Sequence, residues 1–141
     1  MRKDSVKKVL DRIDNTKSDL IKFLSDSIKF KSINPEMMDE NISELQDYQE
    51  WTNKKLLSWK VFDDVSLKSS DITQPNVIAT LNNDNKGSLI FNGHSDVVPV
   101  TKDQENAWQL GSPWGGEIVD NKICGRGASD MKGGSVAFLW A

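Results

Sequence analysis

The chain has 141 residues, a mass of 15.8 kDa and a formal net charge of −3 from 18 basic and 21 acidic residues. This length corresponds to one domain with a hydrophobic core. The small acidic excess argues against nucleic-acid binding through phosphate neutralisation, and no apolar run approaches the roughly 20 residues that a membrane span needs. The N-terminus lacks the apolar core of a secretory signal, and the single cysteine, Cys124, excludes an internal disulfide. We therefore expect a cytoplasmic protein that binds neither nucleic acid nor membranes.

The first 86 residues contain no glycine, and residues 1–60 hold 23 of the 39 charged side chains, a composition typical of helices. Apolar residues at helical spacing predict one helix around Val6 to Ile13, a second capped by Thr16 and reaching Ile28, and a third from about Asp39 to Trp59. Ser32-Ile33-Asn34-Pro35 should end the second helix, because proline disfavours a helical conformation in the residue before it.

The remainder of the chain predicts strands and shaped loops. Strands are expected over 60–65, 77–81 and 88–92, with the last two forming an antiparallel hairpin and 88–92 buried as a central strand. A further helix should begin near Gly133. Together these elements predict an α/β fold in which N-terminal helices pack on a mixed β-sheet.

The only histidine of the chain, His94, follows the predicted central strand, where open α/β sheets place their ligand crevice. Asp96 comes two residues later. In extended backbone these two side chains point to the same side, so the Asp96 carboxylate can reach the imidazole and orient it for metal binding. A histidine satisfied by a nearby aspartate for structural reasons alone explains the spacing as well.

A second cluster, Ile123-Cys124-Gly125-Arg126-Gly127-Ala128-Ser129-Asp130-Met131-Lys132-Gly133-Gly134, predicts a tight loop that presents one carboxylate. A dinucleotide-binding loop is excluded, because Asp130 occupies the third glycine position and would repel a pyrophosphate. The Asp130 carboxylate instead suits a cation.

These two motifs occur in the order and spacing of one family. The chain resembles the zinc-dependent amidohydrolases and metallopeptidases that include acetylornithine deacetylase, succinyl-diaminopimelate desuccinylase, aminoacylase and glutamate carboxypeptidase. The resemblance covers about Leu20 to Ala141 and rests on these segments: 32–35, 76–79, 89–99, Trp108, 113–114 and 125–134. Trp114 and Cys124 differ from the aromatic residues that the family more often has, and Cys124 is expected to be a buried small hydrophobe.

The resemblance implies roles for three residues. His94 matches a ligand of one metal, Asp96 matches the catalytic carboxylate that holds this histidine, and Asp130 matches the aspartate that bridges two metals. It also implies a cis peptide bond after Asp130. The implied cofactor is Zn²⁺, two ions per complete site, with Co²⁺ or Mn²⁺ as possible substitutes.

The resemblance further implies that the remaining ligands, the general base, and a smaller domain for dimerisation lie beyond the sequence given. We therefore expect residues 1–141 to be the N-terminal portion of the metal-binding catalytic domain of a homodimeric hydrolase acting on N-acyl amino acids or short peptides, and to be inactive alone. The apolar segment 136–140 should then be exposed and favour self-association.

Two alternatives stay open at this point. One is a catalytically inactive remnant acting as a folding or interaction module. The other is a different metallohydrolase that completes its site with a second subunit.

Overall fold

The computed structural model describes residues 2–37, 43–69, 74–82 and 87–140. Helix α1 spans Arg2–Ile28, α2 spans Leu45–Trp59, α3 spans Lys102–Asn106 and α4 spans Gly133–Trp140. The strands are β1 (Asp64–Lys68), β2 (Asn76–Thr80), β3 (Ile118–Val119) and β4 (Lys122–Ile123). Two short helical turns, Pro35–Met37 and Ala128–Lys132, complete the elements.

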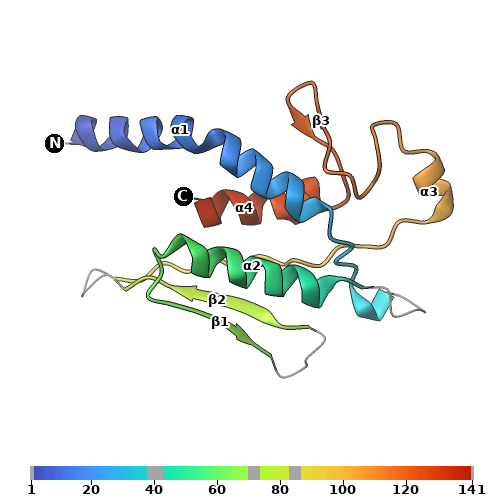
Figure 1. Cartoon of the computed structure of the whole chain (residues 1–141), viewed down its shortest axis with the longest axis horizontal. Helices are drawn as coiled ribbons and strands as arrows, with labels where there is room; N and C mark the ends of the chain where they lie inside the picture. The colour runs from blue at the N-terminus through green and yellow to red at the C-terminus, as the bar shows by residue number, and fades with distance from the viewer. Residues whose placement is uncertain (1, 38–42, 70–73, 83–86, 141) are drawn as a thin grey trace.

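The elements are arranged in layers. Helices α1 and α4 lie side by side, α2 lies below them, and the β1–β2 hairpin lies below α2 (Figure 1). Both sheets in the described part of the chain are antiparallel and two-stranded, β1 with β2 and β3 with β4. One parallel bridge joins Ile33 to Val97. The α/β class predicted from the sequence is confirmed, although the sheets are small.

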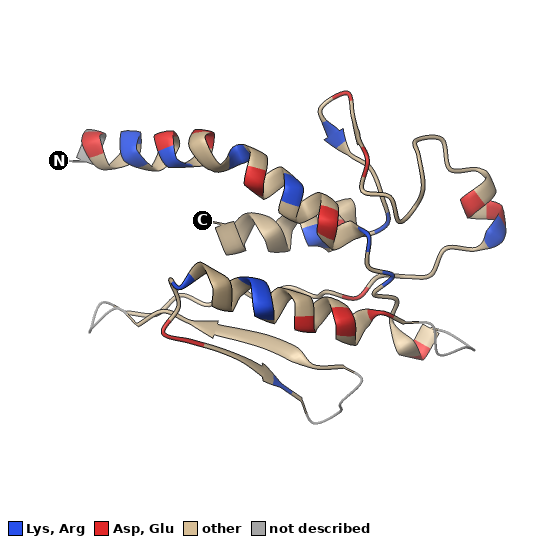
Figure 2. Cartoon of the chain, in the orientation of Figure 1, with Lys and Arg blue, Asp and Glu red and all other residues tan. Residues whose placement is uncertain are grey.

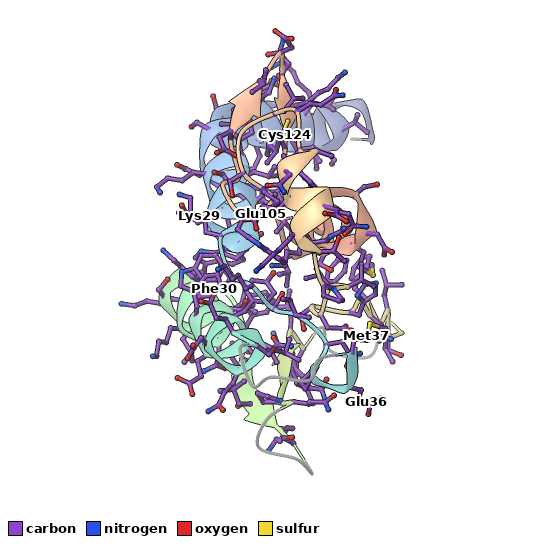
Figure 3. The ribbon with its side chains drawn as sticks, turned by 90° about the vertical axis from the view of Figure 1, so that its right-hand side faces the viewer. Lys29, Phe30, Glu36, Met37, Glu105 and Cys124 are labelled. Carbon is purple, nitrogen blue, oxygen red and sulfur yellow. The ribbon has the colours of Figure 1, made fainter. Side chains whose placement is uncertain are left out.

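The core lies between the three long helices and is rich in aromatic rings. Phe23 of α1 contacts Trp51 and Trp59 of α2 and Trp140 of α4, with ring centroids 4.7, 5.6 and 6.0 Å away. Phe30 lies between α1 and α2 (Figure 3). Offset and tilted aromatic pairs of this kind add stability beyond their buried area, so they hold α1, α2 and α4 in one unit.

The predicted helix boundaries need two corrections. A single helix replaces the first two predicted ones, because Thr16 does not cap a new helix but donates from its hydroxyl to the Arg12 carbonyl one turn earlier. The third helix begins at Leu45 rather than Asp39; residues 38–42 lie outside the described residues. The predicted stop after Ile28 is confirmed.

The first half of α1 extends beyond α4 (Figure 1), and basic and acidic residues are interspersed along its ribbon (Figure 2). Its apolar stripe of Val6, Val9, Leu10 and Ile13 is about half exposed. Helical periodicity therefore predicted the helix correctly, although no described element covers this stripe.

The predicted strand over 88–92 is wrong in the described structure. These residues are irregular, and Leu89 and Ile90 are 78% and 84% exposed. The partner expected for this segment, β2, instead pairs with β1 over five residues from Asp64↔Thr80 to Lys68↔Asn76. The β1 strand itself lies four residues later than predicted, whereas β2 lies within one residue of its predicted bounds.

The predicted helix near Gly133 is confirmed as α4. The expectation that its apolar segment 136–140 is exposed is wrong. Val136 is 1% exposed, and Trp140 packs against Phe23 and Trp59 and donates from Nε1 to Thr16 Oγ1 at 2.9 Å. Helix α1 packs against this segment of α4, which was expected to need the rest of a larger sheet to bury it. No helix in the described part of the chain is long and apolar enough to cross a bilayer.

Candidate metal-binding site

His94 lies at the end of the irregular segment that precedes Val97. The backbone after it is fixed by the parallel bridge to Ile33, with Val97 N–H donating to Ser32 O at 2.9 Å and Asn34 N–H donating to Val97 O at 3.0 Å. Val97 is buried. The bridge therefore attaches the His94–Asp96 segment to the chain that follows α1.

The imidazole of His94 has an acceptor at each nitrogen. Nδ1 lies 3.0 Å from the backbone oxygen of Asp96 and 3.4 Å from its Oδ1, while Nε2 lies 3.0 Å from Asp130 Oδ1. A carbonyl oxygen can only accept, so the hydrogen bond at Nδ1 places a proton on that nitrogen. Nε2 is then the nitrogen that faces Asp130.

Asp130 is presented by the tight loop that the sequence predicted. Gly127 has φ of +83°, and a Cβ at this position would lie 2.6 Å from Val97 Cγ1, so the loop approaches Val97 as only glycine permits. The Asp130–Met131 peptide bond is cis, as the family resemblance implied. The Asp130 side chain is 88% exposed, which leaves its carboxylate free to contact a ligand.

Lys132 anchors this loop to the end of α1, a role that its place in the motif alone does not predict. Its ammonium donates to Ser27 O at 2.8 Å and Phe30 O at 3.0 Å, and lies 4.4 Å from the Tyr48 ring centroid. These carbonyls belong to the last turn of α1 and the residues after it, which lack helical partners. Burial lowers the pKa of Lys132 to about 7 by desolvating the ammonium, and also raises the pKa of Tyr48 to about 12.

The hydrogen-bond acceptors around His94 also shift the pKa of its imidazole. Burial lowers its pKa, but the hydrogen bonds to the Asp96 carbonyl and the Asp130 carboxylate, with the negative charges of both aspartates, raise the pKa above its ordinary value overall. The pocket around Nε2 therefore favours positive charge, as a proton on the ring or as a cation between imidazole and carboxylate.

The donor set fits a zinc ion in kind. Imidazole nitrogen and carboxylate oxygen are both common zinc ligands, and the 3.0 Å between His94 Nε2 and Asp130 Oδ1 lets one ion contact both. The two residues line an open depression of about 240 Å³ together with Asp96–Val98, Gly125–Gly127 and Ser129. Within the described residues no three His, Cys, Asp or Glu side chains are placed so that they could hold one metal ion together, so these residues supply only part of a coordination sphere.

The structure thus brings together all three predicted site residues, from two loops 36 positions apart in the sequence. Neither Trp108 nor Trp114 lines the depression, and both are half-buried. Cys124 is half-buried rather than fully buried, and its backbone N–H donates to Glu117 O at 2.8 Å.

Three polar residues around the site were not predicted from the sequence. Asn34 Nδ2 donates to Asp96 Oδ2 at 3.0 Å, Ser32 Oγ donates to Ser95 O at 2.8 Å, and Gln49 Nε2 donates to Ser95 Oγ at 2.6 Å. Asn34 and Ser32 belong to the helix-ending segment that the sequence marked only as a break. Because their hydrogen-bond partners lie some 60 positions away in the sequence, no short sequence pattern predicts these contacts.

Fold and site together define an α/β protein with a histidine and two carboxylates in a loop-lined depression. Residues 90–141 match the model of "Peptidase family M20/M25/M40". This match covers both motifs, and the predicted resemblance to this family is confirmed.

Among curated proteins, the chain is 40% identical over 121 residues to succinyl-diaminopimelate desuccinylase of Rickettsia akari, covering 86% of this chain and 29% of that protein. The desuccinylase of Rickettsia felis is 38% identical over the same shares of the two chains. That of Aliarcobacter butzleri is 49% identical over 59 residues, 42% of this chain and 15% of the relative. The chain therefore spans less than a third of the length of these relatives.

Proposed function

We propose that residues 1–141 form the N-terminal portion of the metal-binding catalytic domain of a two-zinc hydrolase that cleaves amide bonds of N-acyl amino acids or short peptides. The observation that carries this proposal is the convergence of His94 Nε2 and Asp130 Oδ1 at 3.0 Å inside the segment that matches the family model. Because several relatives are named succinyl-diaminopimelate desuccinylases, an N-succinylated diamino acid is the first substrate to test. The complete enzyme is proposed to be a homodimer.

Three residues of this chain have distinct proposed roles in metal binding. His94 would hold the first ion through the lone pair of Nε2, since its Nδ1 proton is engaged by the Asp96 carbonyl oxygen. Asp130 would hold that ion and a second one through its carboxylate, as the family resemblance implies. Asp96, whose Oδ1 lies 3.4 Å from Nδ1, orients the ring and raises the basicity of Nε2. Zinc ions, when bound, lower the pKa of a water molecule and polarise the scissile carbonyl.

An inactive remnant that serves as a folding or interaction module is the second candidate. The half-exposed apolar stripe on α1 and the exposed segment 88–92 favour it, because both offer apolar surface for a protein contact. The two candidates differ in one respect that can be measured: only the hydrolase needs His94 and Asp130 to bind a metal together.

Zinc titration of the chain, followed by the ¹⁵N signals of His94, tests this proposal. His94 is the only histidine, so its ring signals need no assignment. We expect zinc to shift Nε2 far more than Nδ1. Asp130→Asn should weaken this response at least about 10-fold, as loss of a ligand or its close support does in metal sites.

The matched control is Asp103→Asn, the same change at an exposed aspartate of α3. It should titrate like the unsubstituted chain. A zinc response that is equal in all three proteins, or absent in all, would remove His94 and Asp130 from a shared metal site.

A further inference from the structure

The segment 32–34 lies directly beside the segment 95–97. Val97 N–H donates to Ser32 O, Asn34 N–H donates to Val97 O, and Ser32 Oγ donates to Ser95 O. Both Ser32 and Val97 are buried. Three hydrogen bonds at this crossing hold the Asn34 side chain in register with Asp96.

The Asn34 side chain makes two hydrogen bonds that fix its orientation. Its Oδ1 accepts from Glu36 N–H at 2.9 Å, in the turn that follows Pro35. Because the backbone N–H can only donate, the oxygen of the amide must face Glu36 and its nitrogen must face Asp96. Nδ2 is 3.0 Å from Asp96 Oδ2. The hydrogen bond to Glu36 N–H therefore ensures that the Asn34 side chain presents its NH₂ group, a donor, to the Asp96 carboxylate.

This contact determines how the carboxylate is turned. With Oδ2 held by Asn34, Oδ1 is directed to the imidazole, 3.4 Å from His94 Nδ1. We infer that Asn34 is a positioning residue, which orients the Asp96 carboxylate and through it the imidazole of His94. Its catalytic relevance rests on the proposed function of Asp96, whereas the contact itself does not.

Asn34→Asp tests the contact with Asp96 separately from the hydrogen bond that Asn34 accepts from Glu36 N–H. The aspartate keeps an oxygen for Glu36 N–H, but it replaces the donor toward Asp96 with a second carboxylate that repels it. The readout is the long-range ¹H–¹⁵N spectrum of the single histidine, without metal, at a pH that keeps the ring neutral. We expect the two ring nitrogens to lose the pattern of a single Nδ1–H tautomer. Asn106→Asp, the same change at the exposed end of α3, should leave the spectrum unaltered.

The exchange of both partners provides the rescue. Asp96→Asn alone should also disturb His94. The Asn34 amide nitrogen would then bind the single side-chain oxygen at position 96, and this oxygen would no longer face the imidazole. In the double variant Asn34→Asp with Asp96→Asn, the donor and acceptor are reversed, and the amide oxygen at position 96 is again directed to Nδ1. The His94 pattern should then return toward that of the unsubstituted chain. A role in packing alone would not predict this recovery.

Two outcomes would overturn the inference: a His94 spectrum unchanged by Asn34→Asp, or a double variant no closer to the unsubstituted chain than the single ones. A measurement on the unsubstituted chain covers the case of a variant that does not fold. There, the side-chain amide protons of Asn34 should exchange with solvent at least about 10-fold more slowly than those of Asn106, and equal rates would also overturn it. None of these readouts needs zinc or substrate, so their failure is distinguishable from failure of the proposed function.

Discussion

With saturating zinc, the purified chain should hydrolyse an N-succinylated diamino acid at least about 100-fold more slowly than the Rickettsia akari desuccinylase assayed beside it. The described residues place only one imidazole and one carboxylate where an ion could contact both. Asp96 is engaged with Asn34 and His94, which leaves no described carboxylate in the depression to act as general base. Loss of a general base alone typically lowers a rate by about 10²–10⁴-fold.

The assay has a built-in control for contaminating enzyme. Any turnover that belongs to this chain should fall in Asp130→Asn and persist in Asp103→Asn. Zinc-dependent turnover within about 100-fold of the relative, lost in Asp130→Asn, would show that the residues of this chain suffice for hydrolysis and would contradict the expectation.

Leu56→Ala should lower the free energy of unfolding by about 2–5 kcal/mol, whereas Leu57→Ala should change it by less than about 0.5 kcal/mol. Leu56 is 2% exposed on the face of α2 that meets the core, and its neighbour Leu57 is 52% exposed. The two substitutions remove the same atoms from the same helix, so the difference between them measures burial alone. Urea unfolding followed by tryptophan fluorescence gives both values.

Equal effects of the two substitutions would mean that α2 does not bury this face. The packing of α2 against its neighbouring layers would then be wrong. An unchanged dependence of the free energy on urea concentration in both variants would show that the comparison is made between the same folded and unfolded states.

Part of the geometry of the candidate site was predictable because some of its signals are local. His94 and Asp96 are two residues apart, so extended backbone alone predicts that their side chains lie on one side, and the structure places Asp96 Oδ1 3.4 Å from the ring. The loop that presents Asp130 is marked by its glycines. That Asp130 would meet His94 came only from the family resemblance, because nothing local relates two loops so far apart in the sequence.

What the sequence could not predict depends on long-range contacts. Asn34 and Lys132 are ordinary polar residues in the sequence, and their partners lie 62 and 102 or more positions away. The merging of the first two predicted helices has a different origin: Thr16 has the right chemistry for a cap, but its hydroxyl is satisfied within the helix by Arg12 O. The strand predicted over 88–92 had the right composition, but a strand also requires a neighbour, and β2 is paired with β1.

The most direct test of the proposed metal site is anomalous diffraction at the zinc edge from crystals of this chain soaked in zinc. We expect a peak within about 2.0–2.2 Å of both His94 Nε2 and an Asp130 oxygen. Zinc found only elsewhere, or bound to His94 with Asp130 turned away, would contradict it.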